Sequence, residues 1–290
     1  MLALAVLWGS SFINLKISLQ ELQPFTLVFL RTSIAGLALL LWCVLSKRSL
    51  KLTLKEHIIL FGMGMTSSAI PFSFFTWGQQ FVNTSVASIF NGTVPFFTAI
   101  FAHFILGHSE RLSANKIIGL LIGFVGILTI IGFDVITEFD VTNIAQLSLI
   151  CATFFYAISG IYNRLWVSDS LNNTVISTYC LLWSGLVTGF IAIYFEGLPT
   201  LDYSHNIWLS ITILSLLSTA LAYVILFKLL KRAGPSNTSL STFIIPIFAI
   251  AIGVILLGES LEVNEIIGVV LILVGVGFIQ NLQKRLAKLF

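Results

Sequence analysis

Apolar residues run in stretches of about 20 along almost the whole chain, and short polar connections separate them. A helix of about 20 apolar residues is long enough to cross the hydrocarbon core of a bilayer. The pattern predicts ten spans, which cover residues 2–19, 24–45, 57–77, 83–107, 115–133, 143–165, 174–195, 206–230, 236–257 and 263–282. We therefore expect an all-α polytopic membrane protein without a separate soluble domain.

The composition supports this class. Of 290 residues, 57% are hydrophobic and only 9% are charged, whereas soluble domains carry about 25% charged residues. The three cysteines, at 43, 151 and 180, lie far apart in apolar runs, which indicates packed thiols rather than a disulfide framework or a metal site. We expect no cofactor and no nucleic-acid partner. The first apolar run begins at Leu2 with no basic segment before it, so it predicts a first span rather than a cleavable signal peptide.

The charges divide between the two sides of the predicted bundle. With the N-terminus inside, thirteen of the fifteen basic residues fall on the cytoplasmic side: Lys47, Arg48, Lys51, Lys55, Arg111, Lys116, Arg164, Lys228, Lys231, Arg232, Lys284, Arg285 and Lys288. The opposite side receives Asp134, Glu138, Asp140, Glu196, Asp202, Glu259, Glu262 and Glu265. Because positive charge gathers on the cytoplasmic side, this split predicts an inner-membrane protein with both termini in the cytoplasm.

The chain contains a long internal repeat. Residues 95–107 align without a gap to 246–258, and six of the twelve residues in 115–126 are identical in 264–275. Upstream, 6–16 matches 154–164. The repeats are residues 1–133 and 143–290, each with five spans. Since five is odd, the second copy must be inverted in the membrane, and such inverted repeats are typical of secondary transporters.

Each repeat carries a polar stripe on one helix face, with steps of three, three and four residues. The stripes consist of Ser85, Ser88, Asn91 and Pro95 in the first copy, and Ser236, Ser239, Thr242 and Pro246 in the second. We predict that the stripes line opposite mouths of one cavity, with Pro95 and Pro246 as hinges or gates. The alternative is that these hydroxyls only bond back to their own helices or permit close helix packing.

These motifs resemble the EamA family of the drug/metabolite transporter superfamily. The resemblance rests on Trp8-Gly9 near the start, Arg31 in the second span, the tandem architecture and the sequence LLGE at 256–259. It implies ten transmembrane helices, with spans 1–4 and 6–9 around a central cavity, and export of amino acids, other metabolites or toxic compounds. Two departures are LGHSE at 106–110, and Ala222 at the position that corresponds to Pro71.

The repeat also points to a cavity wall. Trp8 and Tyr156 occupy equivalent positions, and each is followed three residues later by a serine. A ring and a hydroxyl on one face suit an amphipathic solute. The predicted substrate-binding residues are Trp8, Ser11, Asn14, Arg31, Phe72, Ser88, Asn91, Tyr156, Ser159, Tyr179, Tyr223, Ser239 and Thr242.

Ionisable groups deep in a span are functional candidates. Arg31 lies seven residues into its span, where it could bind a substrate carboxylate or lock the outer helices through carbonyls and hydroxyls. All twelve acidic residues lie near span ends. A proton relay would therefore need His103, and facilitated diffusion or exchange is the simpler expectation.

The leading hypothesis is a secondary transporter that exports a small amphipathic metabolite, such as an amino acid, by alternating access. The alternative is efflux of drugs or toxic compounds. A channel or a non-transporting scaffold is less favoured, because the sequence offers no ring of charge and no soluble domain. An enzyme is not expected, because the spans contain no nucleophile–base set or metal cluster. Gly119 and Gly123 form a small-residue pair that predicts close helix packing, either within the chain or across a homodimer.

Overall fold

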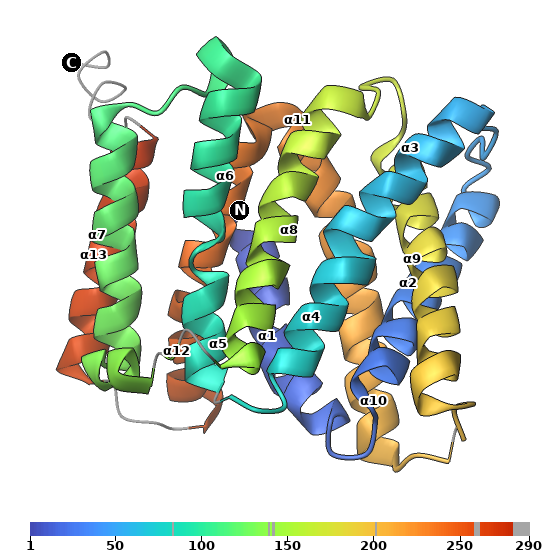
Figure 1. The fold of residues 1–290 in the computed structure, drawn as a ribbon, viewed down its shortest axis with the longest axis horizontal. Helices are drawn as coiled ribbons and strands as arrows, with labels where there is room; N and C mark the ends of the chain where they lie inside the picture. The colour runs from blue at the N-terminus through green and yellow to red at the C-terminus, as the bar shows by residue number, and fades with distance from the viewer. Residues whose placement is uncertain (83, 139, 141–142, 201, 258–261, 281–290) are drawn as a thin grey trace.

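In the computed structural model, residues 1–82, 84–138, 140, 143–200, 202–257 and 262–280 are described, and every regular element among them is helical (Figure 1). The first half contains α1 (Leu2–Ser18), α2 (Pro24–Leu45), α3 (Leu54–Gly64), η1 (Met65–Ala69), α4 (Ile70–Gly78), α5 (Thr84–Asn91), α6 (Val94–Phe101), η2 (Ala102–Leu106), η3 (Gly107–Glu110), α7 (Ala114–Ile131) and η4 (Phe133–Glu138). The second half contains α8 (Ile144–Trp166), α9 (Asn173–Glu196), α10 (His205–Ser215), η5 (Leu216–Leu221), α11 (Ala222–Ser239), α12 (Ser241–Leu257) and α13 (Val263–Ile279).

Seven helical stretches in the described part of the chain are long and apolar enough to cross a membrane, and α1 and α13 are shorter apolar helices. This establishes the all-helical polytopic class, while the count of ten spans stays a prediction. One long stretch, His205–Ser239, covers the predicted span 206–230 and continues into the first residues of the next, 236–257. It contains Gly234, whose backbone is not helical (φ 76°, ψ 170°), so the chain turns within the stretch. The last predicted span ends beyond the described residues.

Local sequence signals explain several helix starts. Pro24 stands in the first turn of α2, where its missing N–H is harmless. Thr53 and Glu56 form a capping box at α3. Asn143 and Asn172 accept backbone N–H groups at the starts of α8 and α9, which satisfies donors that a helix terminus leaves free.

Two helix pairs lie on opposite sides of the molecule, α7 with α13 on the left and α2 with α9 on the right of Figure 1. A Cβ atom at Gly119 would lie 2.5 Å from the carbonyl oxygen of Gly275, and one at Gly126 would lie 2.8 Å from that of Gly268. The small residues therefore pack α7 against α13 within the chain.

Polar contacts fasten the pair α2–α9 at both of its ends. The Glu196 carboxylate at the end of α9 accepts the backbone N–H groups of Phe25 (2.8 Å) and Thr26 (2.7 Å) and the Thr26 hydroxyl (2.7 Å). At the other end, Arg48 donates to the side chain of Asn172 at 2.7 Å. Each contact joins the first half of the sequence to the second, so hydrogen bonds hold α2 against α9 at both ends of the pair.

The connections place opposite charges at the two ends of the bundle (Figure 1). The basic end carries the connections 46–53, 107–113 and 167–172. The acidic end carries 19–23, 79–82, 197–200 and 202–204. Lys47, Arg48 and Lys51 lie at the basic end, and Glu21 and Asp202 lie at the acidic end. There, hydrogen bonds from the side chain and the backbone of Ser204 lower the pKa of Glu21.

Candidate functional site

A cavity of about 120 Å³ lies between α1, α2, α4, α5, α6, α8, α11 and α12. Ten of the thirteen predicted substrate-binding residues contribute to its wall: Trp8, Ser11, Arg31, Phe72, Asn91, Tyr156, Ser159, Tyr223, Ser239 and Thr242. They come from both halves of the chain. The volume is close to that of cavities of ~150 Å³ that accept benzene-sized molecules, so the site suits a small solute.

Arg31 brings a positive charge to this cavity. Only 6% of the residue is exposed, its Nε donates to the Thr219 hydroxyl at 2.6 Å, and its Cζ lies 4.0 Å from the centre of the Phe72 ring. The one ion pair in the described part of the chain joins Lys116 to Glu110 instead. Among the described residues, the guanidinium thus has a hydroxyl and an aromatic face as neighbours, but no carboxylate.

The backbone beside Arg31 is irregular in both repeats. The π-helical segments η1 and η5 begin 151 residues apart, which is the offset of the repeat. They hold Ser67, whose carbonyl accepts from the Tyr223 hydroxyl at 2.6 Å, and Thr219, the partner of Arg31. Isolated π-helical turns are frequent at functional sites, and these two turn polar groups toward the centre of the bundle.

Hydroxyl groups form the other polar part of the wall, and most of them bond in the same way. Ser11 and Ser159 donate to the carbonyls of Trp8 and Tyr156 at 2.6 and 2.7 Å, so the repeat is visible in the local geometry. Three more lining hydroxyls, those of Thr98, Thr238 and Ser239, also donate to their own helices. The hydroxyl of Thr242 in α12 donates to the carbonyl of Ser239 at the end of α11. Because each hydroxyl has one proton and two lone pairs, these six oxygens offer acceptors to the cavity.

Aromatic side chains separate the polar groups. Phe72 contacts Tyr156 and Tyr223 edge to face, with ring centres 6.2 Å apart in both pairs. Phe12 meets Phe75 in the same way at 6.0 Å. The described part of the wall therefore combines the cation of Arg31, several hydroxyl acceptors and an apolar surface of aromatic rings.

Three predicted residues lie elsewhere. Tyr179 faces the basic end, where its hydroxyl donates to the carbonyl of Leu50 at 2.8 Å. Asn14 donates to the Ser10 carbonyl of its own helix at 2.8 Å. Ser88 is partly buried in α5 but is not among the lining residues. Ser236 is buried and does not line the cavity either, and the side chain of Ser85 lies outside the described residues.

The predicted proline hinges differ from each other. The α5 helix ends at Asn91, and Pro95 stands in the first turn of the next helix, α6. The break thus falls at Gly92 and Thr93, before the proline, because a helix tolerates proline in its first turn. Pro246, in contrast, lies inside α12.

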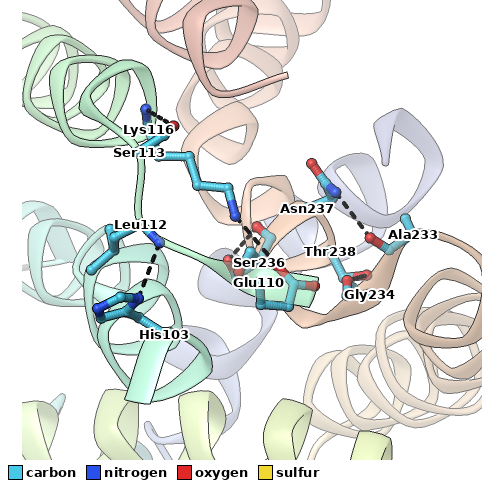
Figure 2. Close-up of polar contacts among 11 residues, drawn as sticks. His103, Glu110, Leu112, Ser113, Lys116, Ala233, Gly234, Ser236, Asn237 and Thr238 are labelled. Carbon is cyan, nitrogen blue, oxygen red and sulfur yellow. Dashed lines mark hydrogen bonds and ion pairs between the residues drawn. The ribbon is translucent and has the colours of Figure 1, made fainter. Parts of the chain in front are cut away.

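Glu110 is buried against Gly234 at the basic end of the bundle. Figure 2 shows its side chain beside Gly234 and Ser236, where α11 turns, with Lys116 at 3.5 Å. Pro235, which follows Gly234, lines the cavity. His103 lies nearby but outside the cavity, and its Nδ1 accepts the N–H of Leu112 at 3.3 Å (Figure 2).

Sequence reasoning missed Gln79, which also lines the cavity. Only 7% of this residue is exposed, and both polar atoms of its side chain lack a hydrogen-bond partner among the described residues. The available signal was its place seven residues after Phe72, on the same helix face.

Comparisons with known proteins agree with a transporter. A family model described as the EamA-like transporter family matches residues 1–132 and 143–280. "Uncharacterized transporter YoaV" of Bacillus subtilis is 23% identical over 95% of this chain and 93% of its own length. A "probable amino-acid metabolite efflux pump" is 26% identical in Escherichia coli and 28% in Salmonella typhimurium, over 94% of this chain and 91% of each relative. A crystal structure with 18% identity has a TM-score of 0.77 and covers 96% of this chain and 95% of its own, so the fold is shared.

Proposed function

The chain belongs to the EamA-like transporter family, and we propose that it is a secondary carrier that exports a small amphipathic metabolite with a carboxylate and an ammonium group. Amino acids are the leading class. The names of the relatives in Escherichia coli and Salmonella typhimurium support this class.

The observation that carries the proposal is the buried guanidinium of Arg31, which forms no ion pair with any described residue. A buried charge without a partner is unfavourable, and the described residues supply Arg31 with no carboxylate. A substrate carboxylate would complete the site, because the guanidinium fork matches its geometry. The acceptors formed by Ser11, Ser159 and Ser239 would then receive the ammonium group, and the aromatic rings would cover the apolar body.

Alternating access between inverted repeats is the proposed mechanism. The helix contacts support it, because α1 packs on α12 as its repeat equivalent α8 packs on α6. In this scheme α2–α9 and α7–α13 stay together, while the helices around the cavity open one end or the other. The contact of Glu110 with Gly234 would close the basic end.

The basic end is proposed to face the cytoplasm, which places both termini there and the protein in the inner membrane. The test is impermeant maleimide labelling of single cysteines in intact cells. A cysteine at position 140 should react from outside and one at position 51 should not. Reaction at position 51 instead would reverse the orientation.

No acidic residue lines the cavity in the described part of the chain, so we propose exchange or facilitated diffusion without a buried carboxylate relay. We propose transport rather than catalysis, because the relatives are named as transporters and efflux pumps. Efflux of toxic compounds is the second candidate, and the aromatic wall favours it. The small cavity and the positive charge of Arg31 argue against large cationic drugs.

The test compares amino acids with the amines that lack only the carboxylate. Binding to purified protein should favour the amino acid strongly, and Arg31→Gln should remove about 10- to 100-fold of that preference, because hydrogen bonds to charged groups are worth roughly 1.5–3 kcal/mol. Arg31→Lys, which keeps the charge, should retain part of it. If both variants keep the full preference, Arg31 is a structural residue and the carboxylate proposal fails.

A further inference from the structure

We propose that Gln79 forms a second polar subsite, which selects substrates by a group at the end opposite the carboxylate. This inference rests on the proposed function, because it takes Arg31 as the contact for the carboxylate. Gln79 would bind a substrate group that both donates and accepts hydrogen bonds, such as a carboxamide.

The side chain of Gln79 is buried and unsatisfied. Its backbone N–H donates to the carbonyl of Phe75 at 3.0 Å, so the residue ends α4 in an ordinary way. The side-chain oxygen and nitrogen, however, have no hydrogen-bond partner in the described part of the chain, and the residue is 7% exposed. Buried amide groups nearly always have a hydrogen-bond partner. Since Gln79 lines the cavity, a ligand in the cavity can provide one.

The repeat shows that packing does not require an amide here. Three lining residues of the first half, Phe72, Phe75 and Gln79, correspond at the repeat offset of 151 residues to three lining residues of the second half, Tyr223, Leu226 and Leu230. Leu230 fills its position as part of an apolar cluster. A leucine could therefore occupy the equivalent wall position at Gln79, and the amide adds a polar group to the wall at the acidic end.

The spacing decides which part of the substrate Gln79 can reach. Arg31 lies over the Phe72 ring, and Gln79 follows Phe72 by seven residues, which is about 10 Å along a helix. The ammonium group of an α-amino acid is adjacent to the carboxylate and is too close to span this distance. The distal end of a linear side chain can span it while its methylene groups contact Phe72 and Phe75.

The experiment compares glutamine with methionine, which share a linear side chain and differ at its end. Dissociation constants are measured on the purified full-length protein and on Gln79→Leu and Gln79→Met. We expect either substitution to reduce the affinity for glutamine relative to methionine about tenfold, the effect of one or two hydrogen bonds. Gln80→Leu is the matched control, because Gln80 is exposed, does not line the cavity and bonds to the Trp77 carbonyl; it should leave the ratio unchanged.

The other outcomes separate this inference from the proposed function. If both Gln79 variants bind the two amino acids with the wild-type ratio, Gln79 does not read the substrate and the inference is wrong. An equal loss for both amino acids would assign Gln79 a structural role, which also overturns it. After either of these two outcomes, the proposed function remains supported if Arg31 is necessary for amino-acid binding. If the wild-type protein binds no amino acid, both fail.

Discussion

The carboxylate of Glu196 should contribute measurably to the stability of the whole bundle. It accepts three hydrogen bonds of 2.7–2.8 Å from the first turn of α2, so Glu196→Ala leaves two backbone N–H groups without their partner. Loss of a helix cap costs about 1 kcal/mol, and a charged acceptor strengthens the effect. Because Glu196 is only partly buried, water replaces some of the lost bonds, and we expect a net loss of about 2 kcal/mol.

The assay is thermal unfolding of purified protein in detergent, followed by intrinsic fluorescence. A loss of this size corresponds to a fall in Tm of roughly 4–8 °C for a domain of 150–250 residues, and somewhat less for a longer chain. Glu21→Gln is the control, because Glu21 is fully exposed, Ser204 donates to it from both the backbone and the side chain, and a glutamine oxygen can still accept these bonds; its Tm should stay near that of the wild type. An unchanged Tm in Glu196→Ala would refute the view that this contact fastens α2 to α9.

Two further predictions concern the ends of the cavity. Gly234→Ala should lower the Tm, because φ is +76° and the new Cβ would meet the Glu110 carboxylate; Gly277→Ala, with open space around it, should change the Tm much less, and equal effects would contradict the prediction. A single cysteine at position 239 should react with maleimide only from the cytoplasmic side, and one at position 88 only from outside. Substrate should change the rate at 239 more strongly, since Ser239 lines the cavity and Ser88 does not. Equal protection at both positions would contradict this placement.

The sequence was sufficient for much of the site, because the internal repeat marks equivalent positions. Trp8 with Ser11 and Tyr156 with Ser159 were predicted as a pair, and all four line the cavity. Arg31 was predicted from its depth in a span, and it is buried in the cavity wall.

The misplaced residues show where such reasoning ends. A span assignment gives the depth of a residue but not the direction of its side chain, so Tyr179 was grouped with the cavity although it bonds to Leu50 at the basic end. Gln79 lies just beyond the predicted end of its span, and its spacing from Phe72 alone did not show that its side chain is buried without a partner among the described residues. The break at Gly92 and Thr93 depends on how α5 and α6 pack, which the position of Pro95 did not show.

The measurement that tests the central claim most directly is counterflow in proteoliposomes. Vesicles that contain the purified protein are loaded with an unlabelled amino acid and diluted into a trace of the same labelled compound. A carrier should draw the label transiently above its equilibrium level, with saturation, and the corresponding amine without a carboxylate should neither drive nor inhibit this accumulation. Two results would contradict the account for every amino acid tested. One is a flux no higher than that of protein-free vesicles, and the other is a higher flux that neither saturates nor shows transient accumulation.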